Sequence, residues 1–477
     1  MNERLYLALD QGGHASRAII FDSSGDALAQ CYAPVATLKP AADRVEHDPE
    51  QICDSLRSAI DDASRRMPAC GEIVAAGLAT QRSTIVCWDR VSGAALSPVI
   101  SWQDRRNADF VARLAAHASE IHARTGLVLS PHYGASKLRW CLENLPAVSD
   151  AAETGRLACG PLSSFLLFRL LEEHPFLVDP ANASRTQLYD PATRDWSPPL
   201  LQLFGVSASA LPTPVGTRHR FGNLRINGRS VPLEICTGDQ STVPFAFGPT
   251  RTDAAYVNIG TGAFIQAPLT QPTIAPPLLT SVIWSDERRV LYALEGTING
   301  AGSALDWFAE VEGPDTQRML AALSLDASRQ LKPPLFINGV AGLGSPFWVA
   351  GLTPRFVGAG SAQERFVALL ESILFLVRVN LDEMQHAGLR LERVVVTGGY
   401  AASDWLCQRL ADLLSLPVHR HAELEATARG LGFLIAQQPA EWRSASEVRL
   451  FAPLSDAGLL ERFFAWLKEM KRAVAAR

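Results

Sequence analysis

The chain has 477 residues, of which 47% are hydrophobic and 19% charged, and its formal net charge is -5. This length exceeds what one ordinary hydrophobic core supports, so we expect two domains. The composition is that of a globular protein, and the negative charge argues against a general binding surface for nucleic acid or anionic membrane. We therefore expect no nucleic-acid or membrane partner.

The cysteines and the apolar segments bear on where the protein works. No two of the eight cysteines form a Cys-x-x-Cys pair, which argues against a zinc knuckle or a redox dithiol. No signal-type apolar segment follows the first residues, and the longest apolar stretch, Phe366 to Val379, is interrupted by Glu371 and Arg378. We expect a buried helix there, mostly buried cysteines, and a cytoplasmic location.

The N-terminal residues predict two strands joined by a turn that carries glycine. Residues 5–10 form the first strand, 11–16 the polar turn and 17–22 the returning strand, before a further strand after Gly25. This alternation is typical of a β-meander.

A helix and another strand follow the meander. Asp48-Pro49 offers an N-cap residue followed by proline at the first helical position, so a helix is expected to begin there and to end near Arg66. Residues 73–79 predict an apolar strand that ends at Gln81-Arg82.

The second half of the chain begins in the same way as the first. Residues 254–259 predict a strand, Gly260-Thr261-Gly262 a turn, and 263–265 a returning strand. The same device thus occurs twice, about 250 residues apart, which is a repeat at the scale of domains. It indicates two related α/β domains, each with one turn that faces phosphate.

The rest of the second half predicts one loop and one nucleotide-type unit. Residues 266–277 are rich in proline and are expected to form a loop. Residues 393–397 predict a buried strand that ends in Gly398-Gly399, and 403–415 predict a helix. Nucleotides often bind at such strand–glycine turn–helix units.

Several short motifs occur in an order that one known family shares. They are Leu9-Asp10-Gln11-Gly12, Ser16-Arg17-Ala18, Val45-Glu46-His47-Asp48-Pro49, Trp102-Gln103-Asp104-Arg105-Arg106, Thr125-Gly126-Leu127, Asn182-Ala183-Ser184-Arg185-Thr186, Gly238-Asp239-Gln240, Gly260-Thr261-Gly262, Tyr292-Ala293-Leu294-Glu295-Gly296, Gly342-Leu343-Gly344-Ser345-Pro346 and Gly398-Gly399. Together they resemble the FGGY carbohydrate kinases, and most closely the glycerol kinases.

The resemblance implies a fold and an activity. The fold is α/β, the two-domain actin-like (ribonuclease H-like) ATPase fold with a cleft between duplicated domains. Residues 1–247 would form the N-terminal FGGY domain with the acceptor pocket and the first phosphate turn, and 248–477 the C-terminal FGGY domain with the nucleotide site. The activity is phosphorylation of a hydroxyl of a small polyol or sugar, with ATP and Mg²⁺. A homo-oligomer is left open.

Three residues are candidates for the chemistry itself. Asp239 follows a short apolar strand, and the resemblance implies that it is the general base and also binds acceptor hydroxyls. The alternative is an aspartate that merely forms a turn beside glycine. Asp10 would hold Mg²⁺ through water and Arg17 would clamp the γ-phosphate, whereas the alternative is a hairpin with a surface ion pair.

The nucleotide would contact turns from both halves. The first turn would present backbone N–H groups to phosphate, with His14 either donating to phosphate or simply completing the turn. The resemblance implies that the nucleotide site consists of Gly12, Gly13, His14, Thr261, Gly262, Gly302, Asp306, Gly399 and Ser403.

The acceptor pocket combines hydrogen-bonding side chains with an aromatic wall, as polyol recognition requires. The resemblance implies that it is formed by Arg82, Ser83, Trp102, His132, Asp239, Gln240 and Phe264. Trp102 and Phe264 would form the wall, unless they are core aromatics.

The sequence departs from the glycerol kinases in the pocket. Ser83 stands where they have glutamate and His132 where they have tyrosine, while Gly13-His14 replace two threonines and Ser403 replaces asparagine. We therefore expect weak activity on glycerol and better activity on longer polyols or ketoses. The alternatives are a strict glycerol kinase and a non-catalytic ligand-sensing protein on the same fold.

Overall fold

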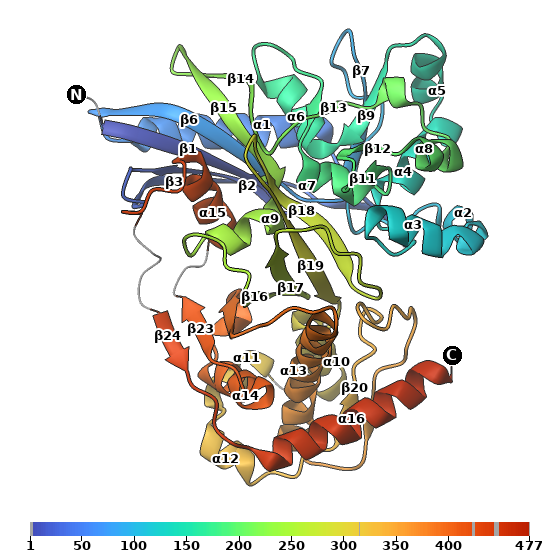
Figure 1. Ribbon diagram of the computed structural model, residues 1–477, viewed down its shortest axis with the longest axis vertical. Coiled ribbons are helices and arrows are strands. Elements are labelled where there is room, and N and C mark those ends of the chain that lie inside the picture. The colour runs from blue at the N-terminus through green and yellow to red at the C-terminus, as the bar shows by residue number, and fades with distance from the viewer. Residues whose placement is uncertain (1–2, 314, 422–424, 443–447, 477) are drawn as a thin grey trace.

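Two mixed β-sheets lie at the centres of the upper and lower halves of the molecule (Figure 1). The structure is a computed structural model that describes residues 3–313, 315–421, 425–442 and 448–476. The six-stranded sheet has the strand order β14 (Arg218–Ile226), β15 (Arg229–Gly238), β6 (Gly71–Thr80), β1 (Glu3–Gln11), β2 (Ala15–Phe21) and β3 (Ala27–Pro34). The seven-stranded sheet has the order β18 (Leu279–Ser285), β19 (Val290–Ile298), β17 (Ala263–Leu269), β16 (Ala254–Ile259), β22 (Arg393–Thr397), β23 (Val418–His421) and β24 (Val448–Phe451).

The two sheets share one pattern of strand pairing. From β3 to β14, neighbouring strands pair antiparallel, antiparallel, parallel, parallel and antiparallel. The same succession leads from β19 through β17, β16, β22 and β23 to β24. The predicted duplication and the predicted two-domain α/β fold are therefore confirmed.

A five-stranded sheet and a group of helices extend the upper half beyond the six-stranded sheet. Its strands are β4 (Leu38–Ala41), β5 (Arg44–His47), β8 (Val99–Ile100), β7 (Ile85–Asp89) and β9 (Leu157–Pro161). The shorter helices are α2 (Ala108–Arg113), α3 (Ala118–Thr125), α4 (Gly134–Asn144), α5 (Pro146–Glu153), α6 (Leu162–Leu170), α7 (Pro180–Ala183) and α8 (Pro198–Phe204). Two short strand pairs also lie in this half, β10 (Leu177–Val178) with β13 (Thr213–Pro214) and β11 (Tyr189–Asp190) with β12 (Asp195–Trp196). A third pair, β20 (Leu335–Ile337) with β21 (Arg355–Val357), belongs to the lower half.

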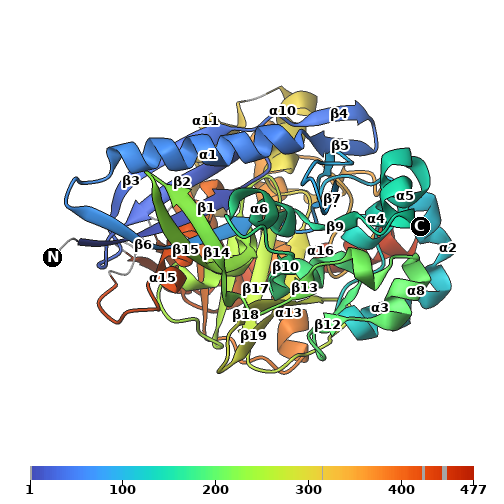
Figure 2. The same cartoon turned by 90° about the horizontal axis from the view of Figure 1, so that it is seen from above.

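The predicted meander and first helix are confirmed. β1, β2 and β3 are consecutive antiparallel neighbours. Helix α1 (Pro49–Arg66) begins after Asp48, whose carboxylate accepts the backbone N–H groups of Glu50 at 2.8 Å and Gln51 at 3.2 Å. The helix lies along one face of the meander (Figure 2).

The lower half is built around helix α13 (Ala362–His386), which contains the predicted buried helix. Its apolar side chains belong to the main hydrophobic core of that half, together with β16, β17 and β22. Helices α10 (Gly302–Glu312), α11 (Thr316–Ala322), α12 (Leu325–Arg329), α14 (Asp404–Leu414) and α16 (Ala457–Ala475) surround it. In the described residues no helix is long and apolar enough to cross a membrane.

Helix α15 (Ala426–Ile435) belongs to the last part of the chain but packs on the first sheet. Residues of β1 alternate between two cores, with Leu7 in the core on the α1 side and Tyr6 in the core on the α15 side. A Cβ atom at Gly432 would lie 2.7 Å from the ring of Phe21, so glycine is required for this close approach. The domain division at 247/248 stays a prediction.

The expected loop over residues 266–277 is partly wrong, because β17 continues to Leu269. The pairing of β17 with β16 ends at Gln266, whereas its pairing with β19 continues to Leu269. Pro268 therefore lies where one side of the strand has no neighbour, and proline is tolerated at such an edge.

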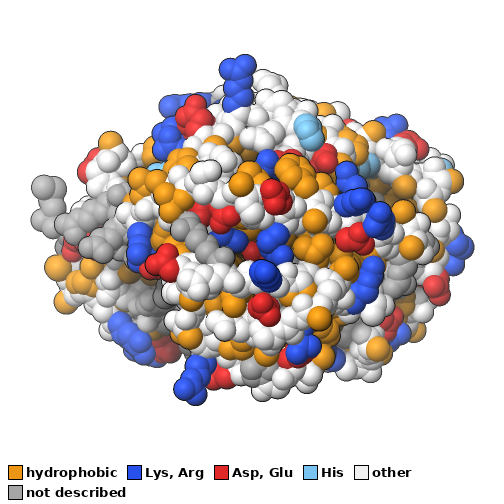
Figure 3. All heavy atoms as spheres, turned by 90° about the horizontal axis from the view of Figure 1, so that it is seen from below, with side chains coloured by type: hydrophobic (Ala, Val, Ile, Leu, Met, Phe, Trp, Pro, Cys, Tyr) orange, Lys and Arg blue, Asp and Glu red, His pale blue; other side chains and the backbone are white. Residues whose placement is uncertain are grey.

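The expectation of mostly buried cysteines is confirmed. Cys70 is exposed and the other seven cysteines are buried, all with free thiols. On the face seen from below, Lys and Arg side chains are interspersed with Asp and Glu rather than gathered by sign (Figure 3).

Candidate functional site

Asp10 and Arg17 face each other at the turn between β1 and β2. They are direct cross-strand partners, and Arg17 Nη1 donates to Asp10 Oδ2 at 3.0 Å. Arg17 Nε also lies 3.4 Å from Glu425 Oε2, at the start of α15, and the Arg17 guanidinium stacks 5.6 Å from the ring centre of Tyr32. Arg17 is thus held by residues from the two ends of the chain.

The carboxyl group of Asp10 is buried and responds to its charged neighbours. The pKa of Asp10 is raised to about 7, mainly by burial; Arg17 opposes this rise, and the nearby Asp239 and Glu425 carboxylates add to it. The Asp239 carboxylate is therefore close enough to Asp10 to influence its pKa.

The first turn leaves its backbone open. The Gly12 N–H donates to Ala15 O at 2.9 Å, and a Cβ atom at Gly13 would meet no atom within 4 Å. His14 is exposed, and its Nδ1 lies 3.4 Å from Thr37 Oγ1. The turn has room for phosphate, but the role of His14 stays open.

Asp239 follows β15 as predicted, at the start of the short helix α9 (Asp239–Thr242). Its side chain is 24% exposed, its Oδ1 accepts the Gln240 N–H at 2.7 Å, and Arg82 Nε lies 4.0 Å away. Burial raises the pKa of Asp239, while Arg82 lowers it. A Cβ atom at Gly238 would lie 2.5 Å from Arg82 Cγ, so the glycine lets the arginine cross the turn.

Glu295 binds two arginines from the other half of the molecule. Arg82 Nη1 and Nη2 donate to its two oxygens at 2.7 and 3.2 Å. Arg185, in the short 3-10 helix η2 (Ser184–Thr186), forms an ion pair with Glu295 Oε2, and Gln266 Nε2 donates to Oε1 at 3.1 Å. The motifs that contain Arg185 and Glu295 were noted in the sequence, but no role was assigned to either residue. The signal was present: Glu295 is a carboxylate inside an apolar strand.

Lys137 connects the loops that carry the pocket residues. Its buried ammonium donates to the carbonyl oxygens of Ser83 at 3.0 Å, Ser101 at 2.7 Å and His132 at 2.7 Å. Burial lowers the pKa of Lys137 well below its ordinary value. Sequence reasoning missed this residue, because nothing in helix α4 distinguishes it from a surface lysine.

The two pocket positions that depart from the glycerol kinases, Ser83 and His132, are linked through Lys137. Ser83 is buried with φ of 61°, a left-handed conformation that non-glycine residues rarely adopt. The His132 ring lies 5.8 Å from Trp102 and 4.9 Å from Tyr133, edge to face in both cases. Burial, and then the nearby positive charges, lower the pKa of His132 well below its ordinary value, so the ring is neutral.

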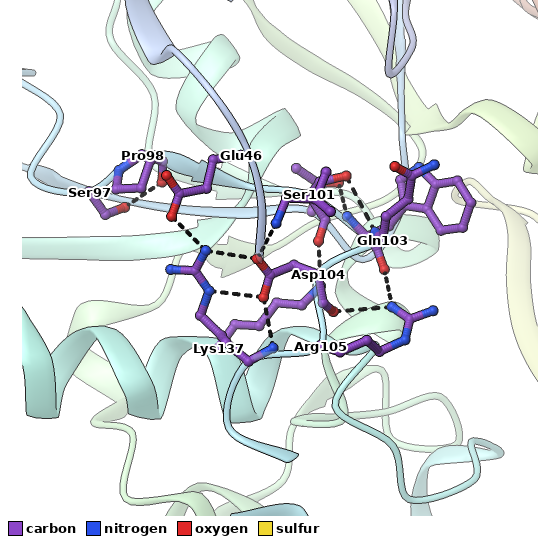
Figure 4. Close-up of polar contacts among 12 residues, drawn as sticks. Glu46, Ser97, Pro98, Ser101, Gln103, Asp104, Arg105 and Lys137 are labelled. Carbon is purple, nitrogen blue, oxygen red and sulfur yellow. Dashed lines mark hydrogen bonds and ion pairs between the residues drawn. The ribbon is translucent and has the colours of Figure 1, made fainter. Parts of the chain in front are cut away.

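A buried ion cluster supports the loop that carries Trp102 (Figure 4). Asp104 accepts the Val45 N–H at 2.7 Å, and Arg106 joins Asp104 at 2.7 Å to Glu46 at 2.6 Å. Arg105 Nη1 donates to the Trp102 carbonyl at 2.8 Å. The Trp102 ring is half-buried and faces His132 rather than the main core.

The nucleotide-side candidates gather in the lower half. The Gly260 carbonyl accepts the Gly302 N–H at 2.9 Å, and the Thr261 carbonyl accepts the Ser303 N–H at 2.9 Å. A Cβ atom at Gly302 would lie 2.6 Å from the ring of Tyr400, in the 3-10 helix η5 (Gly399–Ala402). The second glycine turn, the start of α10 and the turn after β22 therefore meet.

The remaining candidates have definite places. Phe264 is half-buried on β17 two residues before Gln266, hence on the same face of the strand. Asp306 is exposed on α10 and lies close enough to influence the pKa of Tyr400. Ser403 is the N-cap of α14, where its hydroxyl accepts the Leu406 N–H at 3.3 Å, and a Cβ atom at Gly399 would meet open space.

The predicted residues thus form two groups. Asp10, Arg17, Arg82 and Asp239 belong to one set of interacting charges, and Thr261, Gly302, Gly399 and their neighbours form the other. In the residues that the structure describes, no hydrogen bond or ion pair joins the two groups directly. The assignment of both glycine turns to one nucleotide stays a prediction.

A largely buried carboxylate beside fixed arginines meets the requirements of phosphoryl transfer to a hydroxyl, and fold and site together define a kinase of small hydroxyl compounds. The model of the FGGY family of carbohydrate kinases, N-terminal domain, matches residues 5–248, and that of the C-terminal domain matches residues 255–436. The chain belongs to the FGGY family of carbohydrate kinases. The predicted ATP-dependent phosphorylation of a polyol or sugar is confirmed at this level.

Individual relatives agree with this assignment. The chain is 34% identical to a glycerol kinase of Symbiobacterium thermophilum, covering 99% of both chains, and 34% identical to glycerol kinase 1 of Pseudomonas aeruginosa, covering 98% of this chain and 95% of the relative. Its fold is similar to that of a Plasmodium falciparum glycerol kinase with ADP (TM-score 0.89, 22% identity, 99% and 98% coverage). It is also similar to a xylulose kinase from Rhodospirillum rubrum (TM-score 0.85, 21% identity, 99% coverage of both).

Proposed function

We propose that Asp239 is the general base that removes the proton from the acceptor hydroxyl. The observation that carries this proposal is its place: a largely buried carboxylate with a raised pKa, 4.0 Å from Arg82 and close enough to Asp10 to influence its pKa. A carboxylate with a raised pKa is a stronger base once it is ionised. As Asp239 takes the proton, the hydroxyl oxygen bonds to the γ-phosphorus and the bond from that phosphorus to ADP breaks.

The phosphate end of the site is assigned to the first turn. Arg17 would bind the γ-phosphate through its planar guanidinium, and Gly13 would donate its backbone N–H group. The Gly12 N–H already donates to Ala15 O, so Gly12 would contribute by letting phosphate approach the backbone closely. Asp10 fits Mg²⁺ as a single carboxylate beside a phosphate-binding turn, because Mg²⁺ keeps several waters and takes its other ligands from substrate phosphates. When bound, Mg²⁺ neutralises charge that develops on the phosphates.

The rest of the nucleotide is assigned to the lower half. Thr261 and Gly262 would contact phosphate, Gly302 and Asp306 the ribose side, and Gly399 and Ser403 the adenine side. Tyr400, in the turn after β22, packs against Gly302 at the start of α10, so the residues assigned to ribose and to adenine are neighbours. The Ser403 hydroxyl already caps α14, so its donor hydrogen is what remains for a ligand.

The acceptor is assigned to the pocket around Arg82, Trp102, His132, Gln240 and Phe264. Ser83 in place of glutamate offers no charged partner for vicinal hydroxyls and has a smaller side chain. We propose that the preferred acceptor is a longer polyol or a ketose. The strict glycerol kinase remains the second candidate, because the relatives at 34% identity are glycerol kinases. A small-molecule acceptor as the main partner and a cytoplasmic location stay predictions.

The test is an acceptor panel. Purified protein is incubated with Mg-ATP and glycerol, tetritols, pentitols, hexitols or ketoses, and formation of ADP is followed. The proposal expects a higher kcat/KM on at least one longer acceptor than on glycerol, and a turnover lowered by ~10² or more with Asp239→Asn. If glycerol is the best acceptor, the strict glycerol kinase is correct, and turnover by Asp239→Asn at the wild-type rate removes Asp239 from the mechanism.

A further inference from the structure

Two arginines and two carboxylates lie together at the acceptor pocket. Arg82 and Arg185 are 7% and 5% exposed at the side chain, and they face Glu295, which is 2% exposed, and Asp239. Burying a guanidinium or a carboxylate is costly unless it is paired, so each of the four groups depends on the others.

The Glu295 carboxylate pairs with both arginines. Its carboxylate accepts both Nη groups of Arg82, one Nη group of Arg185 and the amide of Gln266. This two-pronged arrangement is the one by which arginine binds carboxylates in ligands. The site therefore contains a complete binding place for a carboxylate, and a side chain of the chain itself fills it.

The carboxylate that pairs with Arg82 comes from a distant part of the chain. Ser83, which follows Arg82 directly, carries no charge, and the Arg82 Nη groups pair with Glu295 on β19 of the other half of the molecule. Arg185 Nε is buried and has no hydrogen-bond partner among the described residues. Arg185 thus keeps one N–H group that Glu295 does not bind.

We propose that Glu295 determines the class of acceptor: it occupies the pair Arg82–Arg185 and thereby restricts the pocket to neutral polyols and sugars, excluding acceptors that carry a carboxylate. This inference rests on the proposed function, since it names the substrate class of the same site. Glu295 also acts as a positioning residue, because it holds Arg82 with Nε towards Asp239 at 4.0 Å and the Nη groups away from it.

Glu295→Gln tests the inference, because it preserves shape and removes only the charge. The probes are two matched pairs that differ in one terminal group, glycerol with D-glycerate and D-glucitol with D-gluconate, and their dissociation constants are measured by titration calorimetry. In the wild type each acid is expected to bind at least about tenfold more weakly than its neutral partner. In Glu295→Gln the affinity for the acids is expected to rise at least about tenfold, because the freed arginine pair gains a charged hydrogen-bond partner. Glu295→Asp keeps the charge and restores the preference for the neutral compounds.

Two outcomes overturn the proposal. One is wild-type protein that binds an acid as tightly as its neutral partner, and this result needs no variant. The other is Glu295→Gln with an unchanged circular dichroism spectrum and no gain of affinity for either acid. If Glu295→Gln does not fold, the double variant Glu295→Gln with Arg185→Gln replaces it, because this variant removes one charge of each sign. Its affinity for the acids is compared with that of Arg185→Gln alone. The inference requires the double variant to bind the acids more tightly.

The positioning role has its own readout. Without Glu295 the arginines are free to approach Asp239, which lowers the pKa of Asp239, so the acid limb of the kcat profile of Glu295→Gln moves to lower pH. An unmoved limb removes the positioning role. Failure of the proposed function is distinguishable from failure of this inference, since the former is seen as absence of ADP formation with every acceptor, whereas the binding measurements require no turnover.

Discussion

Lys137 Nζ donates to the carbonyl oxygen of Ser83 at 3.0 Å and so fixes a residue that the backbone holds in a left-handed conformation. The same ammonium donates to the carbonyl of Ser101, which precedes Trp102, and to the carbonyl of His132. One buried side chain therefore connects three loops that carry residues assigned to the acceptor pocket.

Replacing Lys137 with methionine is expected to disorder the acceptor pocket while leaving the nucleotide site intact. Three carbonyls lose their donor, so the variant should lose roughly 2–4 kcal/mol of unfolding free energy and show a raised KM for the acceptor with an unchanged KM for ATP. Denaturant titration and steady-state kinetics measure both effects. Lys332→Met, at an exposed lysine, is the control and should change neither; equal KM values for the acceptor in wild type and Lys137→Met would contradict the role.

Ser83→Glu combined with His132→Tyr is expected to move activity towards glycerol. A glutamate beside Arg82 provides a charged acceptor for two vicinal hydroxyls, and a hydrogen bond to a charged group is worth ~1.5–3 kcal/mol, or roughly ten- to a hundredfold in specificity. The ratio of kcat/KM for glycerol to that for the best longer acceptor measures the change. The single variants serve as controls, and an unchanged ratio in the double variant would show that these positions do not govern specificity.

Asp239→Asn is expected to lower turnover by ~10² or more, because the acceptor hydroxyl loses its base. ATP affinity, measured by equilibrium binding, should stay close to that of the wild type. Asp109→Asn, an exposed aspartate on α2, is the matched control and should keep full turnover.

The raised pKa of Asp10, about 7, predicts opposite effects of pH on stability and on metal use. The ordinary pKa of the group is 3.8, so its contribution to stability is fully present below that value and is lost as pH rises towards 7. Asp10→Asn should thus be more stable than the wild type above pH 7, by up to ~4 kcal/mol, with the difference vanishing near pH 4.

Metal use should follow the ionised form of Asp10. The Mg²⁺ concentration needed for half-maximal turnover should fall as pH rises through 7 in the wild type, and should respond weakly to pH in Asp10→Asn. Thermal unfolding between pH 4 and 8 and Mg²⁺ titrations of turnover measure the two trends. Asp61→Asn, which changes an exposed aspartate on α1, is the control. If the difference in unfolding free energy between Asp10→Asn and the wild type is the same at pH 5 and pH 8, the pKa assignment is contradicted.

Local signals in the sequence account for much of the fold. The meander, the Asp48 cap of α1 and the turn before Asp239 each depend on neighbouring residues, so hydrophobic period and cap chemistry predicted them. The repeated glycine turn indicated the duplication that the strand pairing now shows. Pro268 led to the prediction of a loop, because its place at an unpaired edge depends on where the pairing of β17 with β16 ends.

The interactions that organise the candidate site were beyond such reasoning. Arg82 and Glu295 are separated by 213 residues, and Lys137 lies 54 residues from Ser83. Periodicity predicts which face of a strand is buried, but it does not pair two charges across two domains. Family motifs contained Arg185 and Glu295, yet only the three-dimensional arrangement shows that they meet.

The packing of α15 on the first sheet also determines when that sheet can be completed during synthesis. The face of β1 and β2 that carries Tyr6 and Phe21 is covered by residues 426–435, which leave the ribosome long after β15 has been made. At roughly 5–20 residues per second, the 188 residues from 248 to 435 take about 10–40 s to synthesise. For that time the nascent chain exposes an apolar sheet face, so chaperones that hold such surfaces should bind it until translation passes Ile435.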